Sequence, residues 1–169
     1  LVLGGIQKHS EKLVEAKRIV IIACGTSWHA GLVAEYLLED LCRIPVEVEY
    51  ASEFRYRNPV IDKGDIIIAI SQSGETADTL AAIELAKSKG AIILGVVNSV
   101  GSSISRLTHE GAYLHTGPEI GVASTHAFTG QLTVLIMIAL RVAMLKQTIS
   151  LPAYQDLLEA LHQIPNKVK

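Results

Sequence analysis

The sequence predicts an α/β fold in which a five-stranded parallel sheet forms the middle layer of a three-layer sandwich. Strands are expected at 18–23, 66–70 and 92–97, because each of these segments holds a short apolar run typical of strands buried on both faces. Segments with helical periodicity separate these runs, and strands that alternate with helices form parallel sheets. The chain has 169 residues, 49% of them apolar, which is enough for one domain with a sizeable core.

In the first half of the chain, a helix is expected over 28–42. Val33, Leu37 and Leu41 lie four residues apart and are predicted to form its buried face. Residues 46–50 alternate between apolar and acidic side chains, which favours a strand nearer the edge of the sheet.

In the second half, helical spacing begins after the strand at 66–70. Leu80, Ile83 and Ala86 recur every three residues, which indicates a helix over 77–89. The remaining elements are expected, in order, as a short fifth strand at 112–115, a buried and almost wholly apolar helix at 126–146, and an amphipathic helix at 151–164.

The ends of the chain indicate a domain taken from a longer protein, because it begins with Leu1 instead of Met and stops soon after a helical pattern. We predict three parts. Residues 1–17 form a lead-in that is partly helical, residues 18–149 form the ligand-binding domain, and residues 150–169 form a helix with the start of a linker.

Charge and cysteine usage exclude several function classes. The formal net charge is −2, which gives no electrostatic case for binding nucleic acid or an anionic membrane. Cys24 and Cys42 show neither disulfide nor zinc spacing, so a reducing cytoplasm is the simplest setting. No signal peptide is visible, and the most apolar stretch, 132–145, is too short to span a bilayer.

The strongest functional signal is the hydroxyl-rich stretch at 71–76, between a buried strand and a helix. Ser71, Ser73 and Thr76 supply three hydroxyls, and Gly74 allows a ligand to approach the backbone closely. A helix N-terminus attracts anions through its unpaired N–H groups. The loop has no Lys, unlike a P-loop, so it suits a phosphate monoester better than a nucleoside triphosphate. The simpler interpretation is an ordinary helix cap.

Three such loops, 24–27, 71–76 and 121–125, follow predicted strands. Ligands of parallel sheets bind outside the carboxyl ends of the strands, so we expect all three loops to meet at one edge. The first loop lacks the glycine spacing of a dinucleotide site, and we expect no such cofactor. Cys24 could be a nucleophile, but a small buried residue is the favoured interpretation. Glu75 is expected to face outward and favour the helix start.

Four motifs occur in fixed order, at 24–27, 51–56, 71–79 and 119–125. Together they resemble the first sugar isomerase (SIS) domain of the glutamine–fructose-6-phosphate aminotransferase family, the glucosamine-6-phosphate synthases. The resemblance extends over about 18–149. Ser-Gln-Ser-Gly-Glu-Thr alone marks the wider SIS family, and the other three motifs narrow it. The resemblance implies a flavodoxin-like SIS fold.

The resemblance also assigns binding residues, which are Thr26, Ser27, Ser71, Gln72, Ser73, Thr76, Val122 and Ser124. The four residues from the 71–76 loop would hold the sugar phosphate with help from Ser27, and Thr26 would reach the sugar. Val122, through its backbone, and Ser124 would face the sugar hydroxyls. His126 stands where the family usually has Lys, so the third loop would lack a fixed positive charge.

No catalytic residue, cofactor or metal is expected in this chain. By the resemblance, the catalytic glutamate, Schiff-base lysine and ring-opening histidine lie in a second SIS domain or its tail, and the glutaminase lies in an N-terminal domain. The implied partners are fructose 6-phosphate or glucosamine 6-phosphate, those two domains, and a second copy in a cytoplasmic homodimer. The chain alone is expected to be inactive.

Two alternatives remain open at this point. One is a non-catalytic, phosphosugar-sensing domain of a transcription regulator. The other is a stand-alone SIS isomerase that completes its site across a dimer, in which Glu119 or His126 would have to act as the base.

Overall fold

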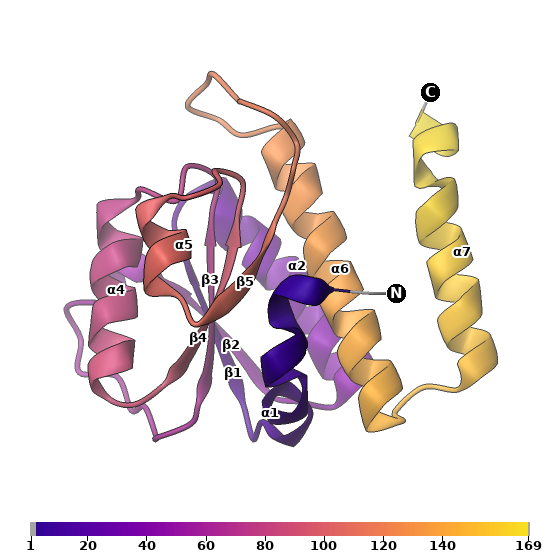
Figure 1. The fold of residues 1–169 in the computed structure, drawn as a ribbon, viewed down its shortest axis with the longest axis horizontal. Helices are drawn as coiled ribbons and strands as arrows, with labels where there is room; N and C mark the ends of the chain where they lie inside the picture. The colour runs from indigo at the N-terminus through magenta and orange to yellow at the C-terminus, as the bar shows by residue number, and fades with distance from the viewer. Residues whose placement is uncertain (1–2, 169) are drawn as a thin grey trace.

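A computed structural model describes residues 3–168 and has one parallel sheet at its centre (Figure 1). The strand order is β2-β1-β3-β4-β5. The strands are β1 (Ile19–Ala23), β2 (Val46–Tyr50), β3 (Ile66–Ser71), β4 (Ile92–Val97) and β5 (Glu110–Tyr113). β3 is central and every one of its residues is buried, whereas β2 lies at the edge, as its alternating sequence predicted. The predicted five-stranded parallel sheet is confirmed.

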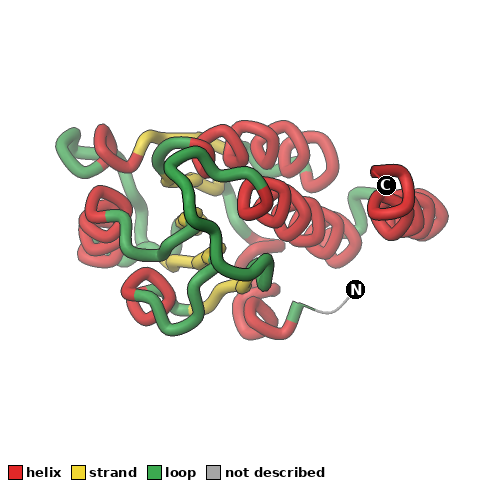
Figure 2. The backbone as a smooth tube through the Cα atoms, turned by 90° about the horizontal axis from the view of Figure 1, so that it is seen from above, coloured by secondary structure: helices red, strands yellow, loops and turns green. Residues whose placement is uncertain are grey.

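Helices cover both faces of the sheet (Figure 2). They are η1 (Gly4–His9), α1 (Ser10–Glu15), α2 (Thr26–Cys42), α3 (Ala51–Phe54), α4 (Ala77–Ser88), α5 (Ser103–Leu107), α6 (His126–Lys146) and α7 (Leu151–Val168). Because strand side chains alternate between faces, Ile19 and Ile21 pack toward α1, α2 and α6, while Val20 and Ile22 pack toward α3, α4 and α5.

The buried face of α2 differs from the prediction. Val33 is 41% exposed, and Leu37 and Leu41 are only partly buried. The helix instead buries a stripe that is mostly small, namely Ser27, Ala30, Gly31, Ala34, Leu38 and Cys42. A Cβ on Gly31 would lie 3.0 Å from side-chain atoms of Ile21 and Val48, so close packing on the sheet selects small residues there. Four-residue spacing identified a helix but chose the wrong face.

α6 packs against α2 and the sheet as a core helix. It has 21 residues and is, among the described helices, the one long and apolar enough to cross a membrane by length and composition. Helices in the core of folded domains can have the same length and composition. Nine of its side chains are buried, which agrees with the predicted core position.

The two terminal segments lie at the side of this core, and only the first packs closely against it. η1 lies against the edge strand β5, where a Cβ on Gly5 would lie 1.9 Å from the carbonyl oxygen of Gly111. α7 follows α6 after a short turn and stands apart from the core along most of its length, and Tyr154, near its start, is its buried residue (Figure 1). Residues 1, 2 and 169, which belong to the predicted lead-in and C-terminal segments, lie outside the described residues.

Candidate functional site

One cleft at the carboxyl edge of the sheet gathers every residue predicted to bind the sugar phosphate. Its lining includes Thr26, Ser27, Ser71, Gln72, Ser73, Thr76, Val122 and Ser124. The cleft has a volume of about 200 Å³. Its walls are the loops after β1 and β3 and the long loop that rises from β5 to α6 (Figure 1). The three hydroxyl-rich loops therefore meet, and their binding role stays a prediction.

The loop between β3 and α4 is held by its own hydroxyls. Ser71 Oγ accepts a hydrogen bond from Gly74 N at 3.0 Å and lies 3.2 Å from Thr76 Oγ1. Ser73 Oγ accepts from Glu75 N at 3.1 Å. Gly74 has a φ of +68°, and a Cβ there would lie 2.1 Å from the Oγ of Ser102. This loop is preformed, and it presents the start of α4, which has no side-chain cap, at the cleft.

The loop after β1 presents a second helix start. Gly25, with a φ of +59°, is the N-cap residue of α2, and no side chain caps this helix either. Thr26 and Ser27 form its first turn and line the cleft. Ser27 is 6% exposed, and its Oγ accepts a hydrogen bond from Gln131 Nε2 at 2.9 Å. Two uncapped helix N-termini thus border one small cleft and favour an anion there.

α6 also begins at the cleft, but the protein's own carboxylate occupies its N-terminus. Glu119 accepts hydrogen bonds from Ser124 Oγ at 2.7 Å, from Thr125 N at 2.7 Å and from His126 N at 3.1 Å. The Thr125 backbone and the Ser124 hydroxyl lower the pKa of Glu119 to about 2. Such a carboxylate stays ionised at neutral pH and is a poor proton acceptor, which argues against Glu119 as the base of a stand-alone isomerase.

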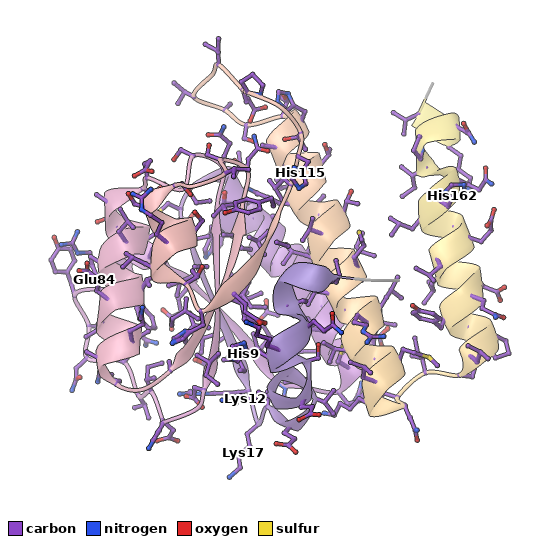
Figure 3. The ribbon with its side chains drawn as sticks, viewed as in Figure 1. His9, Lys12, Lys17, Glu84, His115 and His162 are labelled. Carbon is purple, nitrogen blue, oxygen red and sulfur yellow. The ribbon has the colours of Figure 1, made fainter. Side chains whose placement is uncertain are left out.

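Positive charge at the cleft comes from helix ends, because no Lys or Arg lines it among residues 3–168. Lys12 and Lys17 lie toward the opposite edge of the sheet, whereas His115 lies on the cleft side of the molecule (Figure 3). His126, which stands where Lys was expected, is about half exposed, and its Nδ1 lies 3.3 Å from Glu119 Oε1. His126, which could supply positive charge at this edge only when protonated, is therefore already paired with the carboxylate of Glu119.

Comparison with known proteins agrees with the fold and the cleft described above. The model of the SIS domain family matches residues 12–141, which is more than half of the chain. The chain belongs to the SIS domain family.

This SIS domain is 63% identical over its whole length to the glutamine–fructose-6-phosphate aminotransferase [isomerizing] of Bacteroides thetaiotaomicron. It is 58% identical, over 98% of its length, to that of Chlorobaculum tepidum. It spans only 28% and 27% of these two relatives. It also matches the solved C-terminal domain of glucosamine-fructose-6-phosphate aminotransferase from Francisella tularensis, with a TM-score of 0.88 and 39% identity over 94% of this chain and 45% of that one. The family resemblance inferred from the four motifs is confirmed.

Three features of the SIS domain were missed or misplaced by sequence reasoning. Glu75 is exposed as expected, but it accepts from Ser103 N at 2.8 Å and so caps α5 instead of its own helix. That hydrogen bond to Ser103 lowers the pKa of Glu75. Cys24 is only partly buried and lines the cleft. Gln131 was not singled out, although an amide in an almost wholly apolar helix was the available signal.

Proposed function

We propose that this SIS domain holds the phosphate and sugar hydroxyls of a hexose 6-phosphate within a glucosamine-6-phosphate synthase. That enzyme would make glucosamine 6-phosphate from fructose 6-phosphate and glutamine. The observation that carries the proposal is that eight residues assigned from sequence motifs line a single cleft. High identity to named aminotransferases along the whole chain supports the same parent enzyme.

The chemistry of the cleft favours the phosphate end of the ligand. A phosphate monoester is a small anion that accepts several hydrogen bonds, and the cleft offers the first turns of α2 and α4 with the hydroxyls of Ser27, Ser73 and Thr76. The sugar would extend toward Val122 and Ser124 on the opposite wall. At about 200 Å³ the cleft is smaller than the ~300–1,000 Å³ of whole ligand sites. It therefore suits one end of a ligand whose other end is held elsewhere.

In this proposal the domain positions the sugar phosphate, and other domains of the parent enzyme carry out proton transfer and amination. A firm hold on the phosphate, which does not react, fixes the sugar carbon chain relative to catalytic groups outside this chain. The first test is calorimetric titration with fructose 6-phosphate, glucosamine 6-phosphate and fructose. We expect both phosphates to bind and fructose not to bind. Equal binding of fructose, or no binding of any of the three, would contradict the proposal.

A pair of serine variants locates the binding. Ser73→Ala removes a hydroxyl of the cleft and should weaken binding by about tenfold, because a hydrogen bond to a charged group contributes about 1.5 kcal/mol or more. Ser88→Ala is the matched control, since this exposed serine at the other end of α4 bonds only Leu85 O among the described residues. The control should bind like the wild type. Equal loss in both variants would point to general destabilisation, which a thermal melt would reveal.

The rest of the parent protein is part of the same proposal. Residues 1–17 would be a lead-in, 18–149 the sugar-phosphate-binding domain, and 150–169 the start of a connection to a second SIS domain. A glutaminase domain, a homodimer and a cytoplasmic location complete it. Leu157 and Ile164 on α7 are 40% and 46% exposed, which supports a neighbour on that helix.

Two measurements test this wider assignment. The isolated chain should convert no fructose 6-phosphate, and turnover without other chains would overturn the division of labour. Sedimentation should detect dimers, and finding only monomers at high concentration would count against pairing through this domain.

A further inference from the structure

Gln131 is a fully buried amide in the most apolar helix of the molecule. It has 0% exposure and lies on α6 between the buried Ala127 and Val134. Its Nε2 donates to Ser27 Oγ at 2.9 Å, while its Oε1 has no hydrogen-bond partner among the described residues. Burial of an amide oxygen without a partner costs stability, so the core gains nothing from this side chain over an apolar residue of similar size.

The single bond that Gln131 makes decides what Ser27 can do. A serine hydroxyl has one hydrogen to donate, and an amide NH₂ group cannot accept it. Because Ser27 Oγ accepts from Gln131, its own hydrogen must be donated in another direction. Ser27 is 6% exposed and lines the cleft, so a ligand oxygen there is an available acceptor.

We propose that Gln131 is a positioning residue that fixes the direction of the Ser27 hydroxyl, so that Ser27 donates to an anionic oxygen of the ligand. This inference rests on the proposed function, because it presumes that the cleft takes a phosphate monoester. Among residues 3–168, no Lys or Arg lines the cleft. Binding of an anion there depends more strongly on neutral hydrogen-bond donors, such as the Ser27 hydroxyl, that point toward the ligand. Gln131 acts on the ligand only through Ser27.

A double-mutant cycle tests this role, with the dissociation constant of fructose 6-phosphate as the readout. Gln131→Met keeps the size of the side chain and removes the bond to Ser27. In the wild-type background we expect binding to weaken by about five- to tenfold, the range of one net hydrogen bond. In the Ser27→Ala background the same change should weaken binding by less than about twofold, since there is no hydroxyl left to direct.

Equal weakening of binding by Gln131→Met in both backgrounds would mean a merely structural role, and no weakening would mean no role. Either result would overturn the inference. If wild-type protein binds no fructose 6-phosphate, the proposed function fails first, so the two failures are distinguishable.

The wild-type protein gives a second readout if Gln131→Met does not fold. The NMR signals of the Gln131 side-chain amide should shift on addition of fructose 6-phosphate and stay unchanged with fructose. Signals unmoved by saturating fructose 6-phosphate would contradict the inference.

Discussion

Two of the walls of the cleft, the loops at 71–76 and 116–125, have similar chemistry but are held in different ways. The loop at 71–76 is fixed by bonds within itself and by Gly74, whose carbonyl oxygen accepts from Ile104 N at 2.9 Å. The loop at 116–125 depends on two side chains. Near the base of the loop, Asn98 Oδ1 accepts a hydrogen bond from Thr116 N at 3.1 Å. At its far end, the Glu119 carboxylate accepts from Thr125 N and His126 N, where α6 begins.

This difference indicates a division of tasks between the walls. A wall that is preformed and tightly packed loses little freedom when it holds a phosphate, so its hydroxyls can act at low entropic cost. The opposite wall exposes Ile120 and Val122 completely, at 102% and 109%, and few contacts restrain it. We expect this second wall to adapt to the sugar, and the following changes test the contrast.

The largest effect is expected from Gly74→Ala in the fixed wall. The new Cβ would require a strained positive φ and would lie 2.1 Å from Ser102 Oγ, so the free energy of unfolding should fall by more than about 2 kcal/mol and phosphate binding should be lost. Gly64→Ala is the matched control, because Gly64 has a φ of +90° but nothing within 4 Å of the added Cβ. It should cost about 1 kcal/mol, from backbone strain alone. Denaturant unfolding of both variants measures the difference, and equal losses would refute the packing argument.

A smaller effect is expected from Asn98→Ala, at the base of the second wall. This change removes the acceptor of Thr116 N and the donor to Gly117 O at 2.6 Å, so stability should fall by about 1–2 kcal/mol. Amide hydrogen exchange should accelerate at 116–125 and remain unchanged at 71–76. Acceleration in both loops alike would show that the walls are not held independently.

Glu119→Gln tests the other support of the second wall through its pH dependence. The pKa of Glu119 is lowered to about 2, so its stabilising contribution is complete above the ordinary pKa of 4.5 and is lost as the pH falls through that value toward about 2. The variant should therefore be less stable than the wild type at neutral pH. Thermal melts should show the gap narrowing between about pH 5 and about pH 3. A gap that stays constant over this range would contradict the assigned ionisation.

The smallest effect is expected from Val122→Ala at the tip of the second wall. Its side chain is fully exposed and its predicted contact with the sugar is through the backbone, so stability should change by less than about 0.5 kcal/mol. Calorimetry should give an affinity for fructose 6-phosphate within about twofold of the wild type. A large loss would assign the contact to the side chain.

Sequence patterns predicted the sheet because its signal is local. Continuous apolar runs such as 92–97 identify strands buried on both faces without knowledge of their neighbours. The face of α2 could not be found this way, because Val33 and Ala30 belong to equally regular helical stripes. Only the close approach of the sheet to Gly31 decides between them.

The sequence predicted those residues of the site that belong to contiguous motifs. Its supports come from elsewhere in the chain and were not predicted. Gln131 meets Ser27 across 104 positions, and Glu75 meets Ser103 across 28. Both contacts form only when the fold brings distant segments together, so no local sequence pattern predicts them.

The most direct test of the cleft as a phosphate site is an NMR titration of the isolated chain with fructose 6-phosphate, followed at the backbone amides. We predict saturable shifts at 71–76 and at Thr26 and Ser27, with weaker shifts at 121–125 and none with unphosphorylated fructose. Shifts that concentrate elsewhere in the domain, or that fructose produces equally well, would contradict the account.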